Sequence, residues 1–155
     1  MNLYQELMNQ SIDGNVLPSN LVQRFTPGEI RETIQSLVAT EQIVMANALG
    51  DAALSLYPGS EDILAITSLL AIMNQDWTLA VELMEELLEI QAGNTPAFTY
   101  VMFVRALRCN LEPARAYSVV CEALNKYPSQ LELQAEKLSL DDLSSSVLTP
   151  VAGHH

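Results

Sequence analysis

The residue types that most often carry enzyme chemistry are scarce in this chain of 155 residues. Its two histidines, His154 and His155, end the chain after Gly153 and resemble the remnant of a purification tag. Ser–His and Cys–His catalysis and ordinary zinc ligation therefore lack their commonest ingredient. The six glycines are scattered singly, without the pattern of a phosphate-binding loop. We expect a protein that is not an enzyme and that has no catalytic residues, no metal site and no cofactor.

The densest carboxylate cluster consists of four glutamates at helical spacing, namely Glu82, Glu85, Glu86 and Glu89. Positions i, i+3, i+4 and i+7 lie on one face of a helix, where they could attract a basic partner. An ordinary solvated face opposite a buried apolar stripe explains the same spacing. We favour the solvated face.

Two cysteines, Cys109 and Cys121, are too few for a disulfide framework. Both stand within helical patterns, where an unpaired cysteine usually serves as a small buried hydrophobe. The sequence predicts two buried thiols.

The acidic composition restricts the classes of partner. Seven Lys plus Arg against 19 Asp plus Glu leave a formal charge of -12, which repels phosphate backbones and opposes docking on anionic lipid. No apolar run reaches the ~20 residues that a spanning helix needs. The first ten residues, MNLYQELMNQ, lack the basic and apolar regions of a secretory signal. We expect a cytoplasmic, acidic protein that binds no nucleic acid and does not insert into membranes.

Apolar residues recur at helical spacing from Glu29 to Leu143, and no stretch alternates as a strand does. The predicted fold class is all-α. The length suits one domain, because domains commonly hold ~100–200 residues. Thr26 and Glu29 have the spacing of a capping box, with a proline between them at the first helical position. The pair Thr95-Pro96 repeats the cap-then-proline arrangement.

Three alanines, Ala46, Ala80 and Ala114, recur at intervals of 34 residues. With this period the chain resembles the tetratricopeptide repeat (TPR) family, whose pattern reads W-x2-L-G-x2-Y, then A-x3-F, then P. The large apolar position of the first helix is filled by Ile30, Leu64 and Phe98, and Pro58 stands where the closing proline belongs. All three repeats depart from the pattern at the glycine position and at the tyrosine position, and the latter holds Leu37, Ala71 and Arg105. The closing proline is absent after the second repeat and late, at Pro128, after the third.

The resemblance implies antiparallel helix-turn-helix repeats stacked as a short right-handed solenoid. We expect three repeats over residues 26–59, 60–94 and 95–128. Residues 1–25 would form an N-terminal arm or cap with short helices. Residues 129–143 would form a C-terminal capping helix, and 144–155 a flexible tail.

In this family the first helix of each repeat lines a concave groove that binds the ligand. The residues of this chain that correspond to the family's groove are Arg31, Gln35, Val38 and Ala39 in the first repeat, Ala65, Leu69, Ile72 and Met73 in the second, and Thr99, Phe103, Ala106 and Leu107 in the third. They are mostly apolar. The cations and asparagines that clamp a terminal carboxylate in chaperone-binding members are largely absent. The implied partner is a protein or peptide that presents an amphipathic helix or an extended apolar segment. A terminal segment of the same chain could instead cover the groove.

The resemblance extends to compact three-repeat proteins, including small cytoplasmic chaperones and assembly factors of bacterial secretion systems. These proteins are similar in size, acidity and apolar groove. The implied function is a non-catalytic protein-binding module or small chaperone. The alternative is a structural self-assembly unit, a homodimer formed through the same apolar surface.

Overall fold

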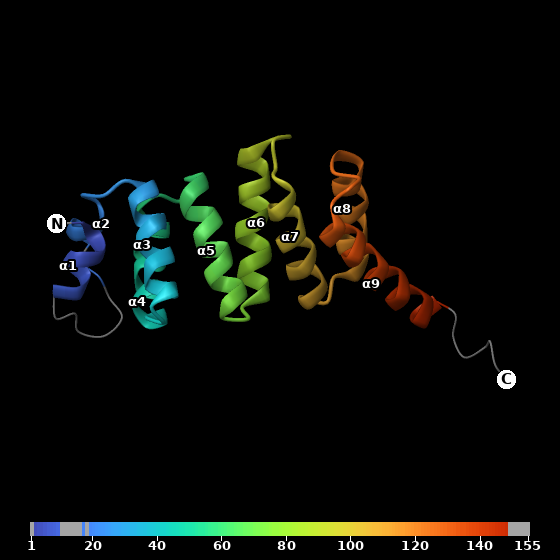
Figure 1. The fold of residues 1–155 in the computed structure, drawn as a ribbon, viewed down its shortest axis with the longest axis horizontal. Helices are drawn as coiled ribbons and strands as arrows, with labels where there is room; N and C mark the ends of the chain where they lie inside the picture. The colour runs from blue at the N-terminus through green and yellow to red at the C-terminus, as the bar shows by residue number, and fades with distance from the viewer. Residues whose placement is uncertain (1, 10–16, 18, 149–155) are drawn as a thin grey trace. The chain divides into compact units, whose positions relative to one another are not determined.

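The computed structural model describes residues 2–9, 17 and 19–148, and these residues form nine α-helices and no strand (Figure 1). The all-α prediction is confirmed. The chain divides into two compact units, Met1–Ala92 (unit 1) and Gly93–His155 (unit 2), where the sequence predicted one folded domain. The division falls at two consecutive residues of positive φ, Ala92 (37°) and Gly93 (90°), which end the helix before them.

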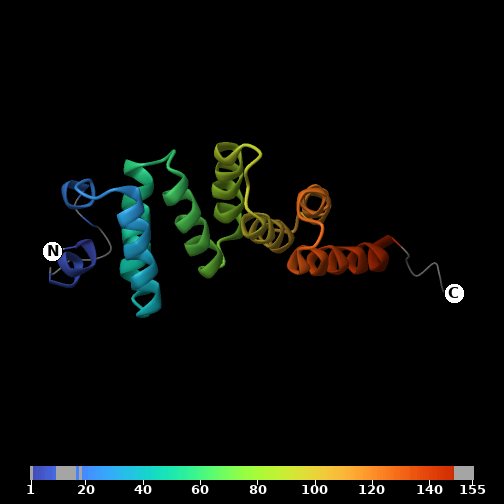
Figure 2. The same cartoon turned by 45° about the horizontal axis from the view of Figure 1, so that its top comes forward.

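Unit 1 contains two helix pairs preceded by two short helices. The pairs are α3 (Pro27–Ala39) with α4 (Ile43–Leu56) and α5 (Glu61–Met73) with α6 (Trp77–Gln91). Figures 1 and 2 show that the helices of each pair run antiparallel. Because α5 packs on both α3 and α4, the second pair stacks on the first.

The helices of unit 1 begin where side chains cap them. The Glu29 amide donates to Thr26 Oγ1 at 3.1 Å, and the Thr26 amide donates to Glu29 Oε1 at 3.0 Å. This arrangement confirms the capping box, which satisfies two amides that the first turn of a helix leaves without a partner. The side chains of Ser60 and Asp76 likewise accept hydrogen bonds from backbone amides in the first turns of α5 and α6.

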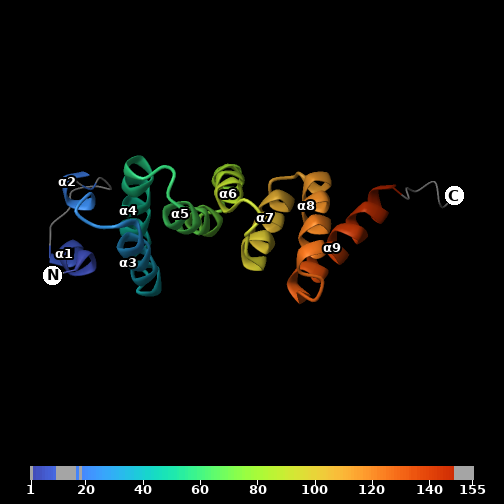
Figure 3. The ribbon, with the colours of Figure 1, turned by 90° about the horizontal axis from the view of Figure 1, so that it is seen from above.

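The short N-terminal helices, α1 (Leu3–Asn9) and α2 (Ser19–Val22), cap unit 1. In Figure 3 they lie beside α3 and α4, where α1 packs on α3 and α2 on α4. Leu3, Leu7 and Val22 are buried in the same core as Ile34. Of the two possibilities left open for residues 1–25, a cap or an arm, the described residues form a cap.

Unit 2 contains α7 (Ala97–Cys109), α8 (Pro113–Lys126) and α9 (Leu131–Leu148). α9 packs on both α7 and α8, as α5 packs on α3 and α4, so it takes the place of the first helix of a further repeat. The predicted tail begins too early, because α9 continues to Leu148 and the first helix breaker after it is Pro150. The rest of that tail, with His154 and His155, lies outside the described residues.

The three intra-pair turns reveal the true repeat length. Each turn places one residue at positive φ, namely Glu41 (60°), Gln75 (59°) and Leu111 (62°). In each, the next amide donates to a carbonyl five residues earlier, at 2.8 to 2.9 Å, which closes the preceding helix as a Schellman motif. The turns are 34 and then 36 residues apart. The third repeat therefore starts two residues later than the 34-residue period predicted.

This shift corrects the residues assigned to the third repeat. Ala116, and not the exposed Ala114, is buried like Ala46 and Ala80. Likewise, Tyr100 occupies the large apolar position of the first helix and is buried, whereas Phe98 is exposed. The physical cause is that α6 has 15 residues against 14 in α4, and the connection after it is also one residue longer.

The closing prolines then fall in register. Pro128 stands 70 residues after Pro58, the sum of the two repeat lengths, and is not late. The tyrosine before each proline has the same role: Tyr57 donates its hydroxyl to the carbonyl of Phe25 at 3.0 Å, and Tyr127 donates to that of Thr95 at 2.6 Å. Thr95 therefore corresponds to Phe25, and not to the capping residue that the sequence predicted.

Replacing Leu111 with glycine is expected to raise the free energy of unfolding by about 0.5–1 kcal/mol. Leu111 combines a left-handed backbone with 87% exposure, so its side chain adds strain and little burial. Thermal and urea unfolding would measure the gain. Leu111→Ala, which keeps the Cβ, serves as the control and should show no gain. A loss of stability in Leu111→Gly would mean that the leucine makes contacts that stabilise the turn.

Candidate protein-binding surface

One side of unit 1 presents an apolar face built by the first helices of its two repeats. On α3, Ala39 is exposed and Val38 half-buried, and on α5 the side chains at i, i+4, i+7 and i+8 form a stripe. The apolar face comprises Val38, Ala39, Ala65, Leu69, Ile72 and Met73. Met73 is 50% exposed, while Leu69 also packs against the core. Since α3 and α5 are in contact, their stripes adjoin.

Polar side chains of α3 border this face. Gln35 is exposed, and the guanidinium of Arg31 lies 3.0 Å from the carboxylate of Asp62 on α5. The ion pair joins the two helices and neutralises the cation that the sequence assigned to the groove. An incoming segment therefore meets mainly apolar side chains.

The four groove residues predicted for the third repeat are buried, so this part of the prediction is wrong. They are Thr99, Phe103, Ala106 and Leu107. The two-residue shift explains the error, because these residues correspond to Ile63, Thr67, Leu70 and Ala71 of α5, which are buried too. The guanidinium of Arg115 lies 5.5 Å from the centroid of the Phe103 ring. A partner could not reach these side chains while α7 remains packed on α8 and α9.

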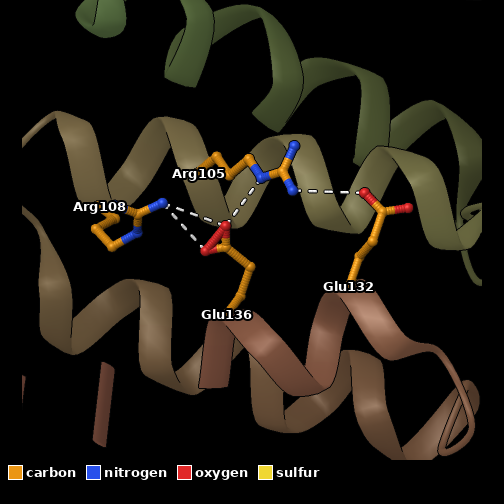
Figure 4. Close-up of polar contacts among 4 residues, drawn as sticks. All are labelled: Arg105, Arg108, Glu132 and Glu136. Atoms are coloured by element: carbon orange, nitrogen blue, oxygen red, sulfur yellow. Dashed lines mark hydrogen bonds and ion pairs between the residues drawn. The ribbon is translucent and has the colours of Figure 1, made fainter. Parts of the chain in front are cut away.

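The residues that occupy the groove positions of α7 are Val101, Arg105, Arg108 and Cys109. Figure 4 shows both arginines directed at α9. Arg105 Nε lies 2.9 Å from Glu136 Oε1, and Arg108 Nη2 lies 3.2 Å from both oxygens of the same carboxylate. Arg105 also approaches Glu132, with Nη2 3.4 Å from Oε2. Glu136 is only 5% exposed, so a buried carboxylate binds two partly exposed arginines.

The sequence prediction that groove cations are largely absent is therefore wrong for unit 2. Both arginines are already paired with Glu136, and this pairing holds α9 on α7 instead of offering free cations to a ligand carboxylate. The signal that could have located them is the repeated Tyr-Pro pair, Tyr57-Pro58 and Tyr127-Pro128. Aligning these pairs aligns Arg105 with Gln35, a groove position.

A second contact joins α9 to α8. Lys137 on α9 lies 3.2 Å from Asp141 and 5.5 Å from the centroid of the Tyr117 ring. The hydrogen bond and charge of Asp141 raise the pKa of Lys137 above its usual value. Because the pair is exposed to solvent, its main effect is to keep the lysine on the aromatic ring.

Neither cysteine is fully buried, which corrects the prediction. Cys121 is half-buried, and Cys109 is exposed because it ends α7 at the position that Met73 occupies in α5. Among the described residues, no three His, Cys, Asp or Glu side chains group in a way that could hold a metal ion.

Charge is distributed very unevenly between the two units. Residues 1–92 hold two arginines against 13 carboxylates, a formal charge of -11, whereas residues 93–155 hold five basic against six acidic residues, a charge of -1. Both arginines of unit 1 form ion pairs, Arg24 with Glu6 and Arg31 with Asp62. The four glutamates of α6 are all exposed, which confirms a solvated face. The negative charge of the chain is therefore concentrated in unit 1.

The helix pairs, their turns and their stacking within each unit define a TPR-like helical repeat fold. Two solved structures of MamA, a TPR-like protein, resemble this chain. The MamA RS-1 ArsTM double mutant has a TM-score of 0.69 at 12% identity, covering 83% of this chain and 74% of that one. The MamA D159K mutant has a TM-score of 0.69 at 16% identity, covering 82% and 76%.

At such low identity this likeness concerns the fold alone. No family model matches the chain, and no curated protein matches it. Among the described residues, no helix has the length and apolar content that crossing a bilayer requires.

Proposed function

We propose that this chain is a non-catalytic protein-binding module, and that the apolar face of unit 1 binds an amphipathic helix or an extended apolar segment of a partner protein. The observation that carries the proposal is the stripe on α5, where Leu69 and Ile72 are half-buried and Met73 is 50% exposed. Apolar side chains at this spacing fit the ridge of a partner helix. Methionine adapts its shape to different partners.

Charge narrows the class of partner further. Unit 1 carries a formal charge of -11, and the apolar face is bordered by one neutralised ion pair. A partner segment with lysine or arginine on its polar side would be attracted, and its association would be fastest at low salt. The favoured ligand is therefore a basic amphipathic segment.

The same proposal extends to a role as a small chaperone or assembly factor, such as those of bacterial secretion systems. Shielding an apolar segment of a client requires a small helical module with an accessible apolar face and high solubility. The fold class, the size of 155 residues and the net charge of -12 support this role.

Replacing Met73 with glutamate is expected to weaken binding of a model peptide by about ten-fold or more, a loss of ~1.4 kcal/mol. The charge would lie in the centre of an apolar contact, where desolvating it is unfavourable. The peptide is a fluorescein-labelled amphipathic helix of leucine and lysine, and anisotropy measures its affinity. Val44→Glu is the matched control, because Val44 is a 65% exposed aliphatic residue on α4 and not on the apolar face.

Two results would contradict this assignment. Equal losses in Met73→Glu and Val44→Glu would show that binding does not depend on the apolar face. Equal affinity for a peptide whose leucines are replaced by serine would show that charge alone drives the interaction. Circular dichroism of each variant checks that the helices are retained.

A second candidate function, self-assembly, is favoured by α9. Leu131 and Leu138 lie seven residues apart on one face of this helix, and both are exposed. Light scattering on the wild type and on Leu131→Glu/Leu138→Glu, over a wide range of concentration, separates the two functions. A dimer that the double variant splits supports self-assembly, whereas a wild type that remains monomeric excludes it.

A further inference from the structure

Unit 1 has a cleft on the side formed by its second helices, away from the apolar face. The cleft lies between α4 and α6, with α5 as its floor. Asn47 and Asp51 line it from α4, Asp76 and Leu79 from the start of α6, and Leu70 from α5. None of its lining residues belongs to the apolar face. This cleft is therefore a separate surface.

Its size limits what it could hold. The volume is about 60 Å³, several times what a single water molecule needs. Pockets for cofactors and other small organic ligands usually measure ~300–1,000 Å³. The cleft has room for one side chain and not for a nucleotide or a similar metabolite.

The polar atoms that line the cleft are mostly acceptors. Asp51 and Asp76 contribute carboxylates, and both residues are exposed at the rim. Asn74 donates one hydrogen of its side-chain amide to Asn47 Oδ1 at 2.9 Å, within the cleft. Asp76 Oδ1 accepts from the Leu79 amide at 3.3 Å, which leaves the carboxylate at the rim beside the start of α6. This rim suits a group that carries several donors and a positive charge.

The inner walls are apolar, and no lysine or arginine stands among the described residues that line the cleft. Leu54, Leu79 and Leu83 line the cleft beside the floor residue Leu70. Residues 1–92 contain no lysine, and their two arginines are paired with Glu6 and Asp62, outside the cleft. Apolar walls below an acidic rim fit the four-carbon stem and compact ammonium group of lysine. The planar guanidinium of arginine would need a wider, bidentate site.

We propose that this cleft binds a single lysine side chain presented by a partner protein. The stem lies against the leucines, and the ammonium group donates to Asp51 and Asp76 at the rim. The site is independent of the apolar face, so a partner could use either surface alone or both at once. The negative charge of unit 1 would attract the partner, and the bound lysine would then fix the partner at one position.

Nα-acetyl-lysine N-methylamide is the probe for this site. The side-chain amide signals of Asn47 and Asn74 in ¹⁵N NMR report its binding to the full chain. We expect saturable shifts with a dissociation constant in the millimolar range, as suits a single side chain. Asp51→Asn/Asp76→Asn should weaken binding at least about five-fold. Asparagine at residue 76 still caps α6, so this variant keeps its fold.

The control variant Glu32→Gln/Glu41→Gln removes the same charge from exposed residues outside the cleft and should bind the probe as the wild type does. Three outcomes would overturn the proposal. The norleucine analogue, which lacks the ammonium group, could bind equally well, or both double variants could weaken binding alike. The arginine analogue could bind while the lysine probe produces no saturable shift.

Discussion

Replacing Glu136 with isoleucine is expected to lower the free energy of unfolding of unit 2 by about 2–3 kcal/mol. The buried carboxylate accepts hydrogen bonds from Arg105 and Arg108, and its loss leaves two cations facing an apolar side chain. Removing one partner of a fully buried pair costs ~3–5 kcal/mol, and the partial exposure of these arginines reduces that loss. Urea unfolding followed by circular dichroism measures the change. The fluorescence of Trp77, the single tryptophan, reports unit 1 separately.

Unit 1 supplies the residues for a matched rescue. The residues of unit 1 that correspond to Arg105, Arg108 and Glu136 are Gln35, Val38 and Ile66. The triple variant Arg105→Gln/Arg108→Val/Glu136→Ile installs this less polar set in unit 2. It should recover most of the lost stability, because replacing a buried ion pair with packed apolar residues is often neutral or stabilising. A triple variant that is less stable than Glu136→Ile would contradict this account and show that the ion network itself stabilises unit 2.

Replacing Gly50 with leucine is expected to destabilise unit 1 by about 3 kcal/mol. Gly50 lies buried in the middle of α4, and a Cβ added there would stand 2.8 Å from Leu70 Cδ1 and 3.5 Å from Thr67 Cγ2, both on α5. A full leucine side chain must therefore displace the buried Leu70 side chain and overpack the contact between α4 and α5. Trp77 fluorescence during urea unfolding would detect the loss in unit 1.

Gly59 offers the matched control for this substitution. It is exposed in the turn between α4 and α5, and an added Cβ meets nothing within 4 Å. Gly59→Leu should change stability by less than about 0.5 kcal/mol. If both glycine variants lose the same stability, close approach of α4 to α5 is not the reason that Gly50 is required.

Much of the fold could be predicted from sequence because its signals are local. The capping box at Thr26 and the helical spacing of apolar residues depend on neighbours within a few positions. The error in the third repeat has an equally local cause. Ala114 and Ala116 stand two residues apart, and a strict period of 34 selects the wrong one. The groove residues of α3 and α5 were unaffected, because the first two repeats do follow that period.

The role of Glu136 could not be predicted in the same way. The leucines of α9 suggest several apolar faces, yet the structure buries Leu133, Glu136 and Leu140 and exposes Leu131 and Leu138. A buried carboxylate is stable only with its partners, and these stand about 30 residues away on α7. Spacing within one helix carries no information about that contact. The charge contrast between the units also became meaningful only once the division of the chain was known.

We propose that the apolar face of unit 1 is the binding site. Methyl NMR of the methionines during titration with the leucine and lysine peptide tests it most directly, with Met73→Leu used to assign the Met73 signal. The account predicts that the methyl of Met73, which is half exposed, shifts in step with binding while that of the buried Met84 stays in place. A peptide that binds by anisotropy while the Met73 signal does not move would contradict it.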